Sequence, residues 1–146
     1  MIQRIQSIFL LLASGSLFSL FGIPFATSDQ QDTALFADKV YNLFDNPLLI
    51  ALTCIAGAIA FINIFLFKKR NVQLKLDYLV ITFSILLTVL AVFFVFKSGG
   101  DDASQIVIKE NYLGLAMPLV AVVFAALANR SIGKDNKLVK SMDRLR

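Results

Sequence analysis

The chain has 146 residues, of which 58% are hydrophobic and 14 are phenylalanine. Soluble domains usually hold about 45–50% apolar residues, so this composition predicts a membrane protein that forms one compact unit. Histidine is absent and Cys54 is the only cysteine, which excludes an intramolecular disulfide and removes the commonest general base and metal ligand. We therefore expect no metal site, no cofactor and no enzymatic activity.

Four stretches without a charged residue are long enough to cross a bilayer. A helix rises about 1.5 Å per residue, so a hydrocarbon core of about 30 Å needs about 20 residues. Helix is the expected backbone because these stretches lack the polar and apolar alternation of barrel strands. The expected spans are residues 5–26, 47–67, 77–96 and 112–129. The predicted fold class is therefore an all-α membrane protein, a four-transmembrane-helix bundle that forms one domain over residues 1–146.

The prolines and the first span need separate consideration. Pro47 suits the first turn of the second span, whereas Pro118 lies in the first third of the fourth. There it predicts either a helix that begins near Ala116 or a kinked helix. The first span resembles a signal peptide, but its uncharged run is longer than the apolar region of a typical signal peptide. The bulky Phe25 also precedes Ala26 at the only suitable cleavage position, so we expect this span to be retained.

The charges of the connecting segments alternate along the chain. Basic residues gather in the N-terminus, in residues 68–75 and after residue 129, while acidic residues gather in residues 29–45 and 101–110. Basic residues near span ends resist translocation, so we predict that both termini are cytoplasmic. The net charge of +4 then reflects topology and contact with anionic head groups, and we expect no nucleic-acid partner.

Small and polar residues within the spans predict where helices pack. Small residues at four-residue spacing let helix backbones approach closely, and an amide inside a span needs an interhelical partner. The predicted packing positions are Gly15, Ser19, Gly57, Ala60, Asn63, Ala121 and Ala125. No charged residue falls inside the four uncharged runs, residues 5–28, 46–67, 78–96 and 111–129. Because ion-coupled transporters and membrane-embedded proteases keep ionisable groups at depth, we expect spans without chemistry.

The tail, residues 131–146, is basic and amphipathic. Leu138, Met142 and Leu145 recur at helical spacing, which predicts a short amphipathic C-terminal helix. The predicted contacts with lipid or with a partner are Lys137, Leu138, Lys140, Met142, Arg144, Leu145 and Arg146. The pattern fits both a helix that rests on anionic lipid and a tail that docks a protein.

The first connection also has a pattern. Asp32 or Thr33 can cap a short helix over residues 34–44,. That helix would have an approximate apolar face and would lie on the outer leaflet or fold over the bundle.

Four stretches carry a family resemblance: MIQRIQ (1–6), NLFDNP (42–47), KKRNVQL (68–74) and KLVKSMDRLR (137–146). With them the whole chain resembles a family of uncharacterised four-helix inner-membrane proteins of Bacteroidota, a domain-of-unknown-function family. The resemblance implies a bacterial inner membrane and the topology above, and it implies no activity. The chain has Asp135-Asn136-Lys137 where the family pattern has Asp-Glu-Lys, which leaves a charge-pairing role for that acid open.

These patterns bear on three functions. The first is a non-catalytic scaffold or accessory subunit of a larger membrane complex, whose partners are the lipid bilayer and other membrane subunits. The alternative is a small four-helix transporter that works as an oligomer, although proteins that resemble multidrug exporters rely on a membrane-embedded glutamate that these spans lack. A quinone-linked thiol oxidase would need paired cysteines, so Cys54 alone excludes that chemistry,.

Overall fold

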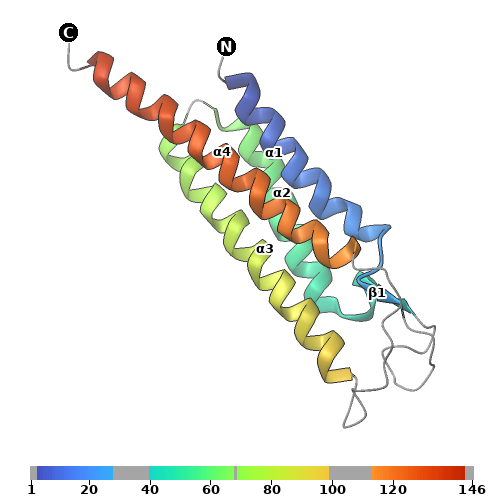
Figure 1. The fold of residues 1–146 in the computed structure, drawn as a ribbon. Coiled ribbons are helices and arrows are strands. Elements are labelled where there is room, and N and C mark those ends of the chain that lie inside the picture. The colour runs from blue at the N-terminus through green and yellow to red at the C-terminus, as the bar shows by residue number, and fades with distance from the viewer. Residues whose placement is uncertain (1–2, 28–39, 68, 99–112, 144–146) are drawn as a thin grey trace.

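The computed structural model is an up-and-down bundle of four helices (Figure 1). It describes residues 3–27, 40–67, 69–98 and 113–143. In chain order the elements are α1 (Gln3–Phe18), η1 (Ser19–Phe21), β1 (Ala26–Thr27), β2 (Val40–Tyr41), η2 (Leu43–Asp45), α2 (Pro47–Phe65), α3 (Arg70–Ser98) and α4 (Leu113–Asp143).

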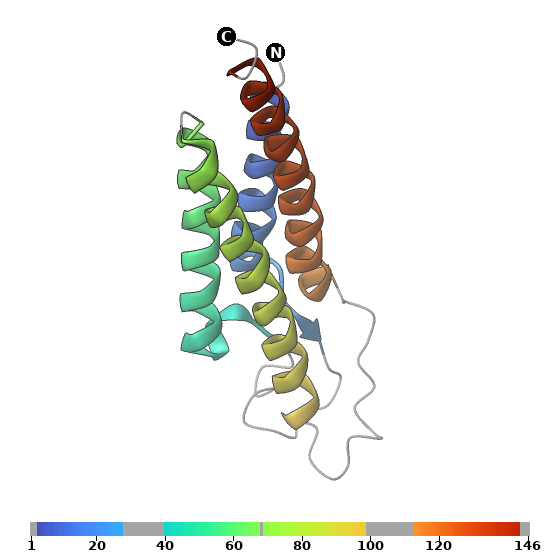
Figure 2. The ribbon, with the colours of Figure 1, turned by 90° about the vertical axis from the view of Figure 1, so that its left-hand side faces the viewer.

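The four helices form a closed square in which each packs against two neighbours. Helix α1 packs against α2 and α4, and α3 packs against the same two helices (Figure 2). The start of α1, the turn between α2 and α3 and the last turns of α4 lie at one end of the bundle (Figure 1). We call this the terminal end, and the opposite one the loop end.

Three of the helices are long and apolar enough to cross a membrane, over Pro47–Phe65, Arg70–Phe94 and Leu113–Val139. The first apolar helix is shorter and covers Ile5–Phe21. It ends before the predicted residue 26 because the chain turns at Gly22, whose N–H donates to the Ser19 carbonyl oxygen at 3.0 Å. The all-α prediction is thus confirmed, and the helices fit a multi-pass membrane protein.

Each helix buries one narrow face with a spacing that alternates between three and four residues. On α3 this face consists of Gln73, Asp77, Val80, Ser84, Leu87 and Ala91. On α1 the corresponding residues are Gln6, Leu10, Ala13 and Leu17, and Leu20 on η1 continues the face. Buried residues with a mean spacing of 3.5 residues form a straight seam along a helix. Such seams are typical of helices that pack side by side with a small crossing angle. The buried face of α4 is rich in alanine, which lets its neighbours approach closely.

Helix α4 is continuous from Leu113 to Asp143 and passes through Pro118. It therefore begins before the proline, and the tail is not a separate helix as expected but the continuation of α4. The physical reason is that the described tail contains no proline and stays packed on the bundle through Ile132 and Asp135, which are both buried. With 31 residues, α4 is about 46 Å long and exceeds the hydrocarbon thickness of about 30 Å.

The loop end is closed by a small two-stranded sheet and two packed rings. Strands β1 and β2 pair in antiparallel register, and the backbone N–H of Phe25 donates to the Tyr41 carbonyl oxygen at 2.8 Å. The rings of these two residues are buried, with centroids 5.8 Å apart. Burial, and then the nearby carboxylate of Asp45, raises the pKa of Tyr41 to about 12. The phenol therefore stays neutral at neutral pH.

The expected helix over residues 34–44 is not present in the part that can be described. Residues 28–39 lie outside the described residues, and the chain that follows is extended at β2 and forms only the single turn η2. Asn42 and Asp45 fix this turn, because the Asn42 N–H donates to the Asp45 carboxylate at 2.6 Å. Asn46 then caps α2 by accepting from the Leu48 N–H at 3.0 Å.

Gly114 holds the start of α4 against the turn before β1. A Cβ at Gly114 would lie 2.6 Å from the Pro24 carbonyl carbon and 2.7 Å from the Phe25 Cα, whereas a Cβ at Gly133 would meet nothing within 4 Å. Only the first glycine is therefore required by a close approach of two backbones.

We expect Gly114→Ala to lower the free energy of unfolding by about 1–3 kcal/mol, because backbone atoms must move to make room. Gly133→Ala, in the same helix, should be neutral or stabilise by up to about 1 kcal/mol, because alanine favours helix over glycine. Denaturant unfolding in detergent, followed by circular dichroism, measures both. Equal effects of the two substitutions would contradict the close contact at Gly114.

Candidate functional site

Polar side chains gather inside the terminal end of the bundle, beginning with Gln6 on α1 and Asp135 on α4. Both are almost completely buried. The Gln6 Nε2 donates to the Asp135 Oδ2 at 2.5 Å, and the Arg70 guanidinium donates to the Asp135 backbone oxygen at 3.4 Å. This buried contact joins the first helix to the last.

A second polar pair joins α2 and α3. The Asn63 Nδ2 donates to the Gln73 backbone oxygen at 3.1 Å, and the Gln73 Nε2 donates to the Asn63 backbone oxygen at 3.2 Å. Asn63 thus has the interhelical partner that a buried amide requires. The side-chain oxygens of both residues are buried and accept no hydrogen bond from any residue in the described ranges.

Asp77 lies one turn deeper than Gln73 on the same face of α3, and its side chain is 0% exposed. The side-chain amide of Asn129 on α4 lies next to the carboxyl group of Asp77. Their contact does not reach the geometry of a hydrogen bond, so both carboxyl oxygens and the Asn129 Nδ2 lack a partner within the part of the chain that the structure describes. A buried carboxyl group without a cation or a donor is costly, and inside a membrane helix it is by default a mark of function.

Two buried hydroxyl groups continue this line further into the bundle. Ser84 on α3 and Thr53 on α2 are fully buried, and the hydroxyl oxygen of each lacks a partner among the described side chains and backbone. Counted from the Asn63–Gln73 pair, Thr53 lies ten residues away on α2 and Ser84 eleven on α3, so the two hydroxyl groups lie at similar depth. We call this set the inner polar row; it consists of Asn63, Gln73, Asp77, Asn129, Thr53 and Ser84.

The inner polar row corrects the expectation that the spans carry no chemistry. The predicted third span was bounded at Asp77 because the charge ended the apolar run, but α3 begins at Arg70 and carries Asp77 inward. The signal was present in the sequence: Gln73, Asp77, Val80 and Ser84 continue the three- and four-residue spacing of the buried face. Reading that spacing through the charge would have placed Asp77 in the interior.

The residues that were predicted to pack between helices fall into two groups. Gly57, Ala60, Asn63, Ala121 and Ala125 are buried. Ser19 is half-buried, and Gly15 is exposed. A Cβ at Gly57 would lie 2.9 Å from the Phe18 ring, so that glycine makes room for a neighbour. Gly15 instead lines an apolar surface groove of about 620 Å³ between α1 and α2, because it lies on the outer side of α1.

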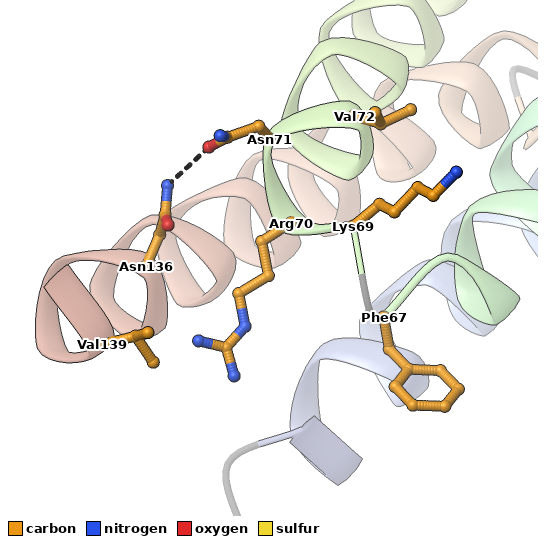
Figure 3. Close-up of a pocket in the computed structure, with 7 residues that line it drawn as sticks. All are labelled: Phe67, Lys69, Arg70, Asn71, Val72, Asn136 and Val139. Atoms are coloured by element: carbon orange, nitrogen blue, oxygen red, sulfur yellow. Dashed lines mark hydrogen bonds between the residues drawn. The ribbon is translucent and has the colours of Figure 1, made fainter. Parts of the chain in front are cut away.

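A second groove, of about 660 Å³, lies on the surface of the terminal end (Figure 3). We call it the basic groove; it is lined by Phe67, Lys69, Arg70, Asn71, Val72, Asn136 and Val139. The Asn136 Nδ2 donates to the Asn71 Oδ1 at 2.9 Å and ties α4 to the start of α3. Figure 3 shows Arg70 extending between Val139 on α4 and Phe67, while Lys69 points elsewhere. The lining contains two basic residues and no acidic one.

Only part of the predicted tail contacts can be placed. Lys137 and Leu138 are exposed on α4 beside the groove residues Asn136 and Val139. Lys140 and Met142 belong to α4, and their side chains lie outside what the structure describes. Arg144, Leu145 and Arg146 lie beyond the described residues altogether.

The described residues contain no group of three or more histidine, cysteine, aspartate or glutamate side chains that could hold a metal ion. No curated protein and no solved structure matches the chain. The family model described as "Domain of unknown function (DUF4293)" matches residues 2–145. The chain therefore belongs to this family.

Proposed function

We propose that the protein is a non-catalytic multi-pass component of a bacterial inner membrane, of the kind found in Bacteroidota, and that it serves as a scaffold or accessory subunit of a larger membrane complex. The distribution of basic residues supports a cytoplasmic terminal end, since Lys69, Arg70, Lys134 and Lys137 all lie there,. In this orientation the basic groove faces the cytoplasm at the level of the lipid head groups.

The observation that carries the proposal is the rigid extension of α4. Beyond Asn136, which is tied to Asn71 at the start of α3, α4 continues to Asp143. On this extension Leu138 is 55% exposed and Val139 is 40% exposed. The apolar stretch of α4 runs to Val139 and is longer than the about 20 residues that cross the hydrocarbon core, so in the proposed arrangement Leu138 and Val139 lie at the level of the lipid head groups, within reach of a partner. Apolar residues beside basic ones, on a helix that is held rigidly, form a suitable surface for a partner protein.

We expect Leu138→Glu to remove a partner, because it places a charge in the centre of the apolar surface. Ser141→Glu is the matched control, since Ser141 is exposed on the same helix and already polar. Native electrophoresis of membranes dissolved in mild detergent should show the unmodified chain and Ser141→Glu in a complex with a discrete second protein, and Leu138→Glu without it. If the unmodified chain always migrates without another protein, the scaffold role is wrong.

Asp77 favours a second candidate, a small transporter that works as an oligomer. The sequence argument against transport rested on the lack of an ionisable group at depth, and Asp77 supplies one. A buried carboxylate can compensate the charge of a cationic substrate or exchange a proton for it. Flux of a lipophilic cation into proteoliposomes distinguishes this candidate: transport requires that flux exceed that of protein-free vesicles and that Asp77→Asn abolish the excess.

A further inference from the structure

We infer that Asp77 is a reversible proton-binding site inside the bundle, which exchanges its proton with the terminal end through the inner polar row. This inference rests on the interior of the bundle and is independent of the docking surface on α4. It assigns a ligand, the proton, to a side chain that the proposed scaffold role does not use.

The first step of the argument is the lack of a compensating charge around Asp77. Among the side chains that the structure describes, the buried faces of α1 and α2 contain no ionisable residue. Among those of α4 the only one is Asp135, which is also acidic and is already engaged by Gln6. The nearest cation on α3 with a described contact is Arg70, which lies seven residues away and donates to the Asp135 backbone. An ionised Asp77 would therefore be an unpaired charge in an apolar interior, whereas the carboxylic acid is neutral there.

The second step concerns Asn129, which can serve both forms of the carboxyl group. An amide side chain has two N–H donors and one carbonyl acceptor. Its NH₂ group can donate to the carboxylate, and after rotation of the amide its oxygen can accept from the carboxylic acid. Asn129 carries no net charge. It can therefore hydrogen-bond both forms of Asp77, but it does not compensate the negative charge of the ionised form. The proton itself is then the only species in the arrangement that neutralises Asp77.

The third step is the route. The side-chain oxygens of Asn63 and Gln73, which have no partner among the described residues, lie between Asp77 and the terminal end, and one helical turn, about 6 Å, separates Gln73 from Asp77. On the other side, Ser84 is the last buried polar residue in the described part of the α3 face, and it is followed by Leu87 and Ala91. Polar groups thus lead from the terminal end to Asp77 and stop at mid-depth. A proton carried by water along these acceptors binds a carboxylate oxygen and leaves by the same route.

A proton fits the site better than a larger cation does. Metal cations with oxygen ligands need about six or more of them, and the surroundings of Asp77 offer a single carboxyl group, one amide and hydroxyl groups two turns away. A proton needs only one carboxylate oxygen to bind and one neighbouring oxygen to accept its hydrogen bond. The test below therefore includes binding of a metal cation as the competing result.

The test is infrared difference spectroscopy of the full-length protein in liposomes, with and without ¹³C-labelled aspartate, between acidic and alkaline pH. We expect a carbonyl band of a protonated carboxyl group that shifts with the label and persists at neutral pH. Ordinary aspartates lose their protons near pH 3.9, so such persistence marks an aspartate in an apolar site. Asp77→Asn should abolish the band, while Leu87→Met, a volume-conserving control at a buried position of the same face that lies outside the inner polar row,, should retain it.

Three outcomes would overturn the inference. The band appears only near the pH at which ordinary aspartates protonate, or it survives Asp77→Asn, or added NaCl removes it at constant pH and so identifies a cation as the ligand. Should Asp77→Asn fail to fold, the ¹³C shift and the pH dependence of the unmodified protein, together with Asp135→Asn, still decide whether a buried aspartate holds the proton. Leu138→Glu should leave the band unchanged, which separates this test from that of the docking surface.

Discussion

The interior of this bundle is constrained by the burial of polar groups among apolar helices. An interhelical hydrogen bond inside a membrane contributes on average about 0.6 kcal/mol, whereas a buried polar group without a partner costs about 1–3 kcal/mol. The Asn63–Gln73 pair gains two such bonds, but the inner polar row holds several atoms without a partner among the described residues. The row therefore costs more stability than it contributes. Stability alone does not explain it, and the inferred proton on Asp77 would neutralise the member of the row whose burial costs most.

The packing of the helices makes this interior possible. Seams with a mean spacing of 3.5 residues keep the same face of each helix turned inward over its whole length, so Asp77 and Ser84 on α3 lie in line with Gln73. Alanines on the buried face of α4, among them Ala121 and Ala125, let the neighbouring backbones approach closely. At the terminal end the Gln6–Asp135 contact fixes α1 to α4, and α4 can then extend as a rigid helix beyond the bundle.

The general architecture could be predicted from the sequence, because long uncharged runs and the hydrogen bonds of the backbone leave helices as the expected solution in lipid. The residues at which the helices begin and end could not be predicted in the same way. Charges ended the predicted spans at Asp77 and near Arg130, yet α3 and α4 both continue through those positions because their buried faces continue. In the first connection, polar residues suggested a helix cap, but pairing between β1 and β2 and the bond between Asn42 and Asp45 favour an extended chain and a single turn. These are tertiary contacts that local patterns do not contain.

The central claim is that α3 carries Asp77 inward to face Asn129, and paired cysteines test it most directly. In a Cys54→Ser background, Asp77→Cys with Asn129→Cys is compared with Tyr78→Cys and Asn129→Cys, since Tyr78 is 61% exposed on the neighbouring position of the same helix. A short thiol-specific crosslinker applied to the protein in membranes should join α3 to α4 in the first pair and not in the second. Crosslinking of the Tyr78 pair in preference to the Asp77 pair would show that α3 is turned the other way, and the inner polar row would not exist as described.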